Sequence, residues 1–411
     1  MLGVGGGSRG RPRPLGAAAL AVLVLVLAFG CTPAPKGGAV KPVRIGTPLP
    51  ITGGEAAFGQ MLERGYRLAV DEINASGGVD GVPLELVVAD HEGKPPLAMS
   101  AAERLITVEQ VLALVGGHSS AVSYPIAQVA QQHKVPYVVD VPGADKITQQ
   151  GWEWVFRINP TSTYYNVGLQ DFLEAVVKPR RAAILFENTL FGTQTADAMK
   201  AWFASRGVEV VVFEPYEAGS LDFKPMLARL VAEPPDVVFM VSYLTDAVLI
   251  MRQCRELGVN PRLFAGAAAG FSLPQFPEQA GPAAELCYVS APWLATARFP
   301  GATRFVERFK GKYGVEPTHH AAAGYSAIKV VADALDRAGR ADREALRQAL
   351  LATRMDTVFG PVRFENFEKY RNQNRLQTVV LQVRNGAYEV IWPPEAATAE
   401  PLFPDPLAGG D

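Results

Sequence analysis

A serine-rich loop between an expected strand and an expected helix offers the clearest chemistry in this chain of 411 residues. Residues 116–123 read Gly-Gly-His-Ser-Ser-Ala-Val-Ser and follow the apolar run Val111–Val115. The free backbone N–H groups and the dipole at a helix start favour a bound carboxylate. Ser119 and Ser120 could bind such a group, or one of them could simply cap the helix. His118 could face the same ligand or pack at the base of the loop.

Two further loops place aromatic side chains directly after strand-like runs. Phe191 lies in Asn-Thr-Leu-Phe-Gly at 188–192, which follows Ala182–Phe186. Tyr243 lies in Ser-Tyr-Leu-Thr-Asp, which follows Val237–Val241. Ligands of open α/β sheets bind at the carboxyl ends of the strands, so both rings could line a site. Either ring could equally be a core or surface aromatic.

Residues that would carry catalysis or bind a metal form no recognisable pattern. The histidines at 91, 133, 319 and 320 lack the spacing of metal ligands. No Gly-x-Ser-x-Gly turn follows a strand, and no local context marks two of the 41 carboxylates as a pair. The net charge of −2 gives no electrostatic case for nucleic acid. The sequence therefore predicts no catalytic residue, no metal site and no cofactor.

Strand-like and helical patterns alternate along most of the chain. One helix pattern places apolar groups at Leu62, Tyr66, Ala69 and Ile73, and Gly77 ends it. Repeated strand–helix units indicate parallel sheets that are covered by helices on both faces. Because there are too many strands for one such sheet, the pattern predicts an α/β fold of two doubly wound, parallel-sheet lobes.

Turn residues mark where the chain crosses between the lobes. Crossings near 159–162 and 291–293 predict lobe 1 from 43–160 plus 293–355 and lobe 2 from 161–292 plus 356–392. A third crossing completes a three-strand hinge, and a small molecule is expected to bind between lobes that close about it. Residues 393–411 are rich in Pro and Ala and are predicted to form a flexible tail.

The N-terminal segment indicates export. Three arginines at 9, 11 and 13 precede the apolar run Leu15–Phe29, which has the length of a signal peptide and is short for a membrane span. We assign residues 1–30 to a signal peptide and 31–42 to a polar tether. Gly30-Cys31 at the end of the run is typical of a bacterial lipoprotein, so Cys31 is the predicted lipid anchor. Ordinary cleavage near Cys31 is the alternative.

The two remaining cysteines, Cys254 and Cys287, have neither a catalytic nor a metal-ligand spacing. An exported protein could bridge them, but two buried free thiols are an equally open alternative.

The segment 43–81 passes from a short strand through a Gly-rich loop into a long helix, and its loop contains Ile51-Thr52-Gly53. With the export signal and the order of the later loops, it resembles the leucine/isoleucine/valine-type (branched-chain amino acid) solute-binding proteins of ABC transporters. The resemblance covers about Lys41 to Trp392. It implies the type I periplasmic binding protein fold, and binding without catalysis.

The resemblance also implies roles for two loops of lobe 1. Ser120 matches the serine that holds the ligand carboxylate, and Ser119 is one residue away. The loop at 140–145 matches a second carboxylate-binding loop, in which Val141 and Gly143 offer backbone groups. Gly143 replaces a residue with a hydroxyl group, so only backbone donation is left at that position.

In lobe 2 the resemblance implies that Phe191 and Tyr243 cover the ligand. Ala268, in the segment 266–271, stands where amino-acid-binding relatives have a glutamate for the ligand ammonium, and Phe271 could add to the pocket. No acidic residue is close to Ala268 in sequence, and Asp246 or Asp140 could reach the ammonium only from another part of the fold. A desolvated ammonium needs a partner, so carboxylates without an amine, amides or aromatic acids are expected to fit better than an α-amino acid.

These patterns predict an exported solute-binding component of an ABC importer, which binds a branched-chain amino acid or a related acid or amide. It is expected to be a monomer, lipid-anchored on the periplasmic or cell-surface side, and to present its ligand to permease subunits. A ligand-sensing receptor of the same fold is the alternative. An enzyme would need a poised nucleophile or an acid–base pair, and the sequence shows neither.

Overall fold

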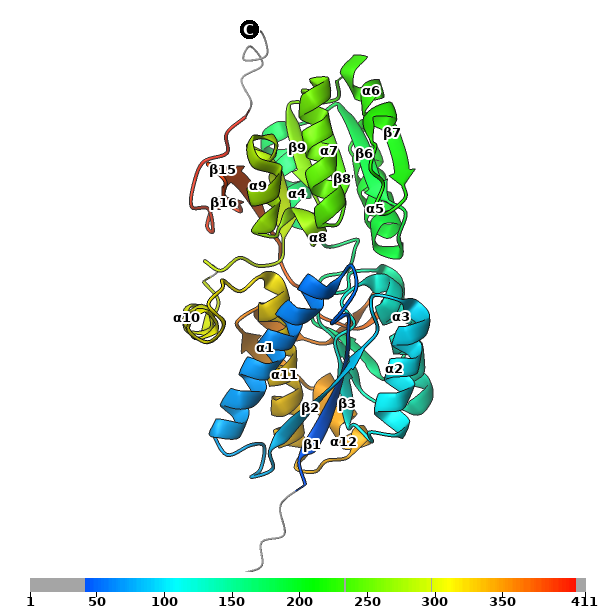
Figure 1. Ribbon diagram of the computed structural model, residues 1–411, viewed down its shortest axis with the longest axis vertical. Helices are drawn as coiled ribbons and strands as arrows, with labels where there is room; N and C mark the ends of the chain where they lie inside the picture. The colour runs from blue at the N-terminus through cyan, green and yellow to red at the C-terminus, as the bar shows by residue number, and fades with distance from the viewer. Residues whose placement is uncertain (1–40, 233, 297, 404–411) are drawn as a thin grey trace, which may run out of the picture. The chain divides into compact units, whose positions relative to one another are not determined.

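The computed structural model describes residues 41–232, 234–296 and 298–403, which form two parallel-sheet lobes (Figure 1). The predicted signal peptide, Cys31 and nearly all of the tether lie outside these residues. Within the described part of the chain, no helix is both long enough and apolar enough to cross a membrane.

Lobe 1 is built on a seven-stranded sheet in the order β13-β14-β5-β4-β3-β1-β2. Only the edge pair β13–β14 is antiparallel. In this register Ile45 lies opposite Leu86 on one side and Ala113 on the other. The strands are β1 (Val43–Leu49), β2 (Leu84–Asp90), β3 (Ala113–Val115), β4 (Tyr137–Val139), β5 (Val155–Arg157), β13 (Glu365–Phe367) and β14 (Tyr370–Gln373).

Helices cover both faces of this sheet, as the apolar strands require. One apolar core packs under α1 (Ala56–Ala75), α10 (Ala302–Tyr313), α11 (His319–Ala338) and α12 (Arg343–Leu351). The other packs under α2 (Pro95–Thr107) and α3 (Ser120–His133), and the short turn η1 (Asp145–Ile147) follows β4. The hairpin β11 (Arg354–Thr357) and β12 (Gly360–Arg363) stands apart from the large sheet.

Lobe 2 repeats this plan with a seven-stranded sheet in the order β16-β15-β10-β9-β8-β6-β7. Its antiparallel pairs are β10–β15 and β15–β16. Every residue of β8 is buried, as expected for a central strand with helices on both faces. The strands are β6 (Arg181–Glu187), β7 (Glu209–Tyr216), β8 (Val237–Val241), β9 (Leu263–Gly266), β10 (Tyr288–Ala291), β15 (Val379–Arg384) and β16 (Ala387–Trp392).

The helices of lobe 2 divide between two apolar cores. One core contains α4 (Val167–Phe172), η2 (Leu173–Val177) and α5 (Leu190–Ser205). The other contains α6 (Lys224–Ala232), α7 (Leu244–Leu257), α8 (Ala268–Phe271), α9 (Gln275–Ala280) and η3 (Gly281–Ala284). The predicted fold of two doubly wound lobes is confirmed.

The chain crosses between the sheets after β5, after β10 and after β14. Hydrogen bonds hold these crossings together. The Gln373 side chain donates to the Asn159 carbonyl at 2.7 Å, and the Asn374 side chain donates to the Ile158 carbonyl at 2.9 Å. Ser290 Oγ donates to the Tyr165 carbonyl at 2.8 Å. The three segments therefore form one hydrogen-bonded hinge.

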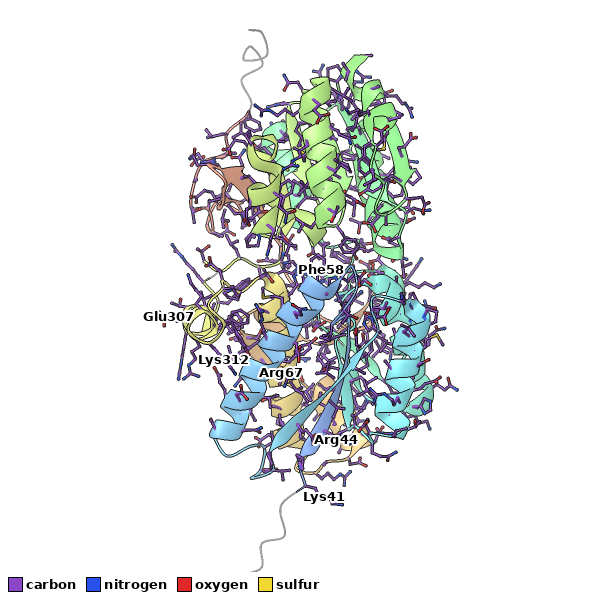
Figure 2. The ribbon with its side chains drawn as sticks, in the orientation of Figure 1. Lys41, Arg44, Phe58, Arg67, Glu307 and Lys312 are labelled. Atoms are coloured by element: carbon purple, nitrogen blue, oxygen red, sulfur yellow. The ribbon has the colours of Figure 1, made fainter. Side chains whose placement is uncertain are left out.

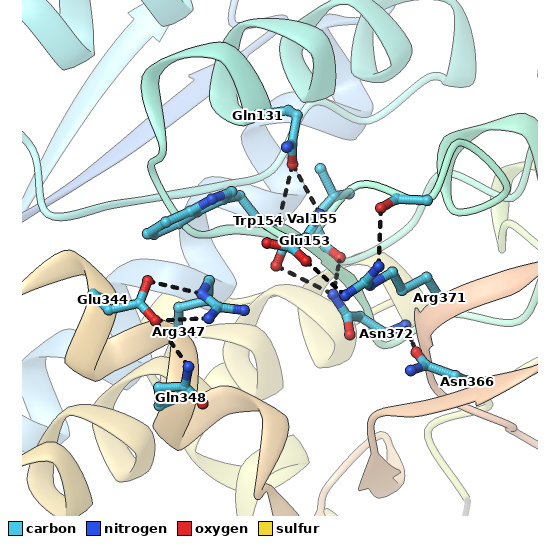
Figure 3. Close-up of polar contacts among 11 residues, drawn as sticks. Gln131, Glu153, Trp154, Val155, Glu344, Arg347, Gln348, Asn366, Arg371 and Asn372 are labelled. Carbon is cyan, nitrogen blue, oxygen red and sulfur yellow. Dashed lines mark hydrogen bonds and ion pairs between the residues drawn. The ribbon is translucent and has the colours of Figure 1, made fainter.

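The predicted boundary at residue 356 is wrong, because residues 360–373 belong to lobe 1. Figure 3 shows the contacts that hold β14 there: Arg371 forms an ion pair with Glu153 at 2.9 Å, and Asn372 donates to the Val155 carbonyl at 3.1 Å. The apolar side chains of Val362 and Phe364 also join the lobe 1 core. The third crossing is therefore the segment between β14 and β15.

The predicted flexible tail is also wrong for residues 393–403. Tyr288 Oη donates to the Leu402 carbonyl at 2.8 Å, and the Leu402 N–H donates to Gln382 Oε1 at 3.0 Å. The ring of Phe403 lies 6.0 Å from that of Tyr288. These contacts fasten the segment to lobe 2 in spite of its Pro- and Ala-rich composition, while residues 404–411 lie outside the described part.

Candidate functional site

A cavity of about 660 Å³ is lined by residues of both lobes. Most of them come from loops and helix starts at the carboxyl ends of the two sheets. A second cavity of about 30 Å³ has room for about one or two water molecules. Five of the residues that line it also line the larger cavity. The shared residues are Phe58, Ser120, Phe191, Tyr243 and His320. The larger volume lies within the range of about 300–1,000 Å³ that is common for small-molecule sites.

A tight turn after β3 brings the serine-rich loop to this site. Gly116, Gly117 and His118 have φ angles of +120°, +108° and +75°. A Cβ on Gly117 would lie 2.1 Å from Ser123 Oγ, so only glycine fits there. His118 adopts the left-handed conformation without being a glycine, at a cost of about 1–3 kcal/mol. Strain of this kind gathers at functional sites, where the surroundings hold it in place.

Four rings, which we call the ring cluster, meet where the two lobes face each other: Phe58, His118, His320 and Tyr243. Phe58 stacks on His118 with 4.4 Å between ring centroids and lies 6.0 Å from Tyr243 of lobe 2. His320 lies 5.3 Å from His118. Figure 2 shows Phe58 at the start of α1, at the opposite end of lobe 1 from Arg44. The ring cluster therefore joins both lobes beside the cavities.

The ring of His118 is buried, and neither of its nitrogens has a hydrogen-bond partner among the described residues. Burial lowers the pKa of His118 to about 3, and the neighbouring His91 and His319 add to this effect. The neutral ring therefore brings one N–H donor and one acceptor to the wall of the small cavity.

The hydroxyl groups of Ser119 and Ser120 do not cap α3. Ser119 is the residue before the helix, yet its side chain makes no capping bond and its Oγ has no hydrogen-bond partner in the described chain. Ser120 Oγ accepts a hydrogen bond from the Ala144 N–H at 3.0 Å, which ties this loop to the loop after β4. The first N–H groups of α3 lack partners within the helix, so they remain available to an acceptor.

Arg157 holds the loop after β4 in place. This fully buried side chain donates to the Pro142 and Ala144 carbonyls at 3.2 and 2.7 Å. Val141 and Gly143 line the small cavity. A Cβ on Gly143 would lie 3.1 Å from the Phe191 ring, so the glycine lets Phe191 of lobe 2 approach closely.

Three carboxylates, which we call the acidic cluster, line the larger cavity: Glu55, Glu187 and Asp246. Burial raises the pKa of Glu187 to about 7, and the negative charges of Asp246 and Glu55 add to the rise. Burial also raises the pKa of Glu55 to about 7, although the nearby Ser119 hydroxyl opposes this. Asp246, whose Oδ2 accepts from the Gly219 N–H at 3.1 Å, has a raised pKa for the same reason. The described lining of the larger cavity contains no Lys or Arg.

The sequence profile of the family described as "Periplasmic binding protein" matches residues 42–387. The chain belongs to this family. It is also 30% identical over 376 residues to the Leu/Ile/Val-binding protein homolog 7 of Brucella melitensis, an alignment that covers 88% of this chain and 94% of that protein. The family binds substrates and is not a family of enzymes.

Solved structures of other binding proteins of ABC transporters are similar to this periplasmic binding protein. The leucine-binding protein LivK of Thermotoga maritima is 29% identical with a TM-score of 0.78, and the match covers 85% of this chain and 97% of that one. LivJ of Streptococcus pneumoniae, in complex with isoleucine, has the same fold with a TM-score of 0.78 at 24% identity, over 89% and 100% of the chains. A Rhodopseudomonas palustris protein in complex with 3,4-dihydroxybenzoic acid has a TM-score of 0.75 at 21% identity, over 84% and 95%.

The structure brings seven of the predicted site residues of this binding protein to the two cavities. They are His118, Ser119, Ser120, Val141, Gly143, Phe191 and Tyr243. Phe271 is not among the residues that line them. Its ring lies over Gly266, 5.0 Å from the ring of Phe276, and belongs to the core of lobe 2. The side chain of Ala268 lies outside the described part of the structure.

Three acidic residues that lie far from Ala268 in sequence line the larger cavity, and Asp246, one of the two acids that sequence left open for a ligand ammonium, is among them. Glu55 precedes α1, Glu187 ends β6 and Asp246 lies in the first turn of α7, so only the folded chain brings them together. Asp140, the other acid that was considered, is buried and accepts from Tyr66 Oη, and neither cavity is lined by it.

Sequence reasoning also missed Phe58, His319 and His320. Thr52 of the Gly-rich loop lines neither cavity, and its hydroxyl donates to Asp90 at 2.5 Å. Phe58 is in the first turn of the helix that follows. His319 and His320 are both buried in the first turn of α11 and line the small cavity. Both histidines directly follow Thr318, the N-cap of α11, and this position at a helix start could have indicated from sequence that they face the site.

Cys254 and Cys287 are free and buried in lobe 2. Burial raises the pKa of the Cys254 thiol to about 12, and it raises the pKa of Cys287 as well. Both therefore act as small apolar core residues. Across the described residues, no group of three or more His, Cys, Asp or Glu side chains is arranged to hold a metal ion.

Proposed function

We propose that this binding protein takes a small molecule with a carboxylate or amide group into the cavity between its lobes and delivers it to the permease of an ABC importer. The observation that carries the proposal is the wall formed by the start of α3, where Ser120 lies, and by the neutral His118 ring, whose nitrogens have no hydrogen-bond partner in the described chain. Helix N–H groups and hydroxyls bind an anionic or carbonyl oxygen without a cationic side chain. The bound isoleucine and 3,4-dihydroxybenzoic acid of the structural relatives both carry carboxylates.

Ligand binding is coupled to closure about the hinge. The loops after β3 and β4 of lobe 1 would bind the ligand oxygen atoms, and Phe191 and Tyr243 of lobe 2 would then cover it. Closure is favoured because the ligand contacts both lobes only when they are together. The closed form is the one that a permease would recognise.

The protein is proposed to act as a monomer that is tethered to the membrane through a lipid on Cys31. A lipid chain and a short polar tether would keep the ligand-loaded protein near its permease. Replacing Cys31 with alanine is expected to move the protein from the membrane fraction to the soluble fraction of fractionated cells. Unchanged membrane association would contradict the anchor.

A ligand screen tests the binding site. Thermal unfolding is measured with isoleucine, leucine, benzoate, 3,4-dihydroxybenzoate and their amides, because a ligand that binds only the folded state raises the melting temperature. Ser120→Ala is expected to weaken the best ligand by about tenfold or more, as for the loss of a hydrogen bond to a charged group. Ser100→Ala, at an exposed site on α2 of the same lobe, is the matched control. Equal affinities of both variants and the wild type would refute the assignment.

A further inference from the structure

The acidic cluster is an unusual lining for a site that receives a carboxylate. Glu187 is 3% exposed, and its Oε2 accepts only a long hydrogen bond of 3.4 Å from the Tyr243 N–H. Glu55 Oε2 is buried without a hydrogen-bond partner in the described chain. Asp246 is 4% exposed. Buried carboxylates are costly unless they are paired, and the described lining supplies no positively charged side chain to pair with them.

The histidines beside the cavity do not supply that charge either. His320 lines the larger cavity, but burial lowers its pKa well below the ordinary value, and His319 and His118 add to this effect. The ring is therefore neutral at physiological pH. The raised pKa values of Glu55 and Glu187 are what three acids without a cation are expected to show.

Two further features of the same cavity favour a cation. The Ser119 hydroxyl is 4% exposed, lines the cavity near Glu55 and has no hydrogen-bond partner in the described structure. It can accept a hydrogen bond from an ammonium group. Phe58 and Tyr243 also line this cavity, and the faces of aromatic rings attract cations.

The acidic cluster lines only the larger cavity. The small cavity, where His118, Val141 and Gly143 are found, has no carboxylate side chain in its lining. The site therefore has two chemically different ends: a neutral, hydrogen-bonding end and an acidic end. A volume of about 660 Å³ gives a ligand room to reach from one to the other.

We infer that Glu55, Glu187 and Asp246 form a second subsite, which binds a terminal primary ammonium group of the ligand. The other end of the same ligand meets Ser120 and Gly143. Its three carboxylates lie outside the segment 266–271 in sequence, and the subsite makes the natural ligand an amine-bearing acid or amide that is longer than a branched-chain amino acid. The inference depends on the proposed function, since it requires a ligand in this cavity.

Two probe pairs that differ only in a terminal amine test the subsite. Hexanoate is compared with 6-aminohexanoate, and norleucine with lysine, by isothermal titration of the full mature chain. The amine-bearing member of each pair is expected to bind about tenfold or more tightly, because a charge-assisted contact in a desolvated site replaces an unpaired carboxylate. Equal affinities within each pair, tighter binding of hexanoate and norleucine, or no binding of either amine would overturn the subsite.

Variants locate the effect. Glu187→Gln keeps the shape of the side chain and removes its charge, and it is expected to weaken 6-aminohexanoate by about 30-fold or more while changing hexanoate little. Glu209→Gln, an exposed carboxylate of lobe 2 whose side chain is 72% exposed, is the control and should leave both affinities unchanged. A loss that is equal for both probes would show a steric role and would overturn the assignment.

Proton release gives an independent readout. Binding an ammonium group should ionise Glu55 and Glu187. The titratable groups near these two carboxyl groups are Asp246 and the un-ionised hydroxyl groups of Tyr243 and Tyr216. The enthalpy of 6-aminohexanoate binding near pH 7 is therefore expected to depend on the ionisation enthalpy of the buffer.

The failure of the subsite can be told apart from the failure of the proposed function. If only the subsite is wrong, hexanoate and norleucine still bind to the wild type. If the proposed function is wrong, every carboxylate of the screen stays unbound.

Discussion

Replacing Glu187 with glutamine is expected to stabilise the ligand-free protein at neutral pH, and to stabilise it less in acid. Burial and the charges of Asp246 and Glu55 raise the pKa of this carboxyl group from 4.5 to about 7 in the folded state. Because the folded state holds the proton more tightly than the unfolded chain, the free energy of unfolding falls as the pH rises from about 4.5 to about 7. Glutamine has no charge to lose, so this fall disappears.

The magnitude follows from the two pKa values. Because the pKa rises from 4.5 to about 7, the carboxyl group lowers the free energy of unfolding by about 3 kcal/mol when the pH is above 7. At about pH 5 it lowers the free energy of unfolding by only roughly 1 kcal/mol. The side chain is 3% exposed, so solvent screening removes little of it. The long hydrogen bond from the Tyr243 N–H can be kept by the glutamine oxygen. The gain in stability from Glu187→Gln should therefore be about 2 kcal/mol larger at about pH 7.5 than at about pH 5.

Urea unfolding of the wild type and the variant at both pH values measures this difference. Comparing two pH values within one pair of proteins cancels any change in packing that the substitution causes. Glu209→Gln is again the control, because its exposed side chain should give the same small effect at both pH values. If the gain of Glu187→Gln were equal at the two pH values, or larger in acid, the carboxyl group would not be held protonated by its surroundings, and the reasoning would fail.

Three other substitutions test how the site is held. A buried neutral histidine with a pKa of about 3 makes the protein less stable as the pH falls below 6.5, because the unfolded chain then binds a proton that the folded state does not. His118→Asn should therefore reduce the loss of unfolding free energy between about pH 7.5 and pH 5 by about 2 kcal/mol, and asparagine tolerates the left-handed backbone. An unchanged pH profile of urea unfolding would contradict this. Arg157→Leu should cost about 3–5 kcal/mol in the same assay, because buried polar partners lose their donor. Arg371→Leu, at a partly exposed ion-pair residue, should cost less than about 1 kcal/mol, and similar costs would show that Arg157 does not hold the loop. Gly117→Ala should lower the melting temperature far more than Gly151→Ala. Both glycines have positive φ angles, but only the Cβ added at Gly117 would lie 2.1 Å from another atom, Ser123 Oγ. Equal shifts in melting temperature would refute the steric argument.

The elements were largely predictable because local patterns specify them. The strand β8 was expected at Val237–Val241 and is found there, since a continuous apolar run with turns at both ends fits a buried parallel strand. The third crossing was misplaced because strands β13 and β14 are short, partly polar and lie at the edge of the lobe 1 sheet. Their place is decided by partners such as Glu153 and Val155, more than 200 residues away in sequence.

The loops of the site were predictable for a similar reason. A parallel sheet brings the carboxyl ends of its strands to one edge, so His118, Ser120 and Gly143 had to come close to one another once the strands were recognised. What the hydroxyl groups do there was not predictable. Ser119 has the sequence position of a helix cap and makes no capping bond, while Ser120 bonds to the next loop instead.

By itself the sequence determined the two-lobe α/β fold and the loops that face the space between the lobes, because apolar periodicity and turn residues act over a few neighbouring positions. The binding role was implied by the resemblance of those loops to a known family. Only the tertiary structure decided the electrostatic character of the cavity. Glu55, Glu187 and Asp246 come from both lobes and have no common local pattern, and their raised pKa values exist only where burial and mutual repulsion act together. Desolvation and Coulomb energy depend on distances in space, which the order of residues along the chain does not contain.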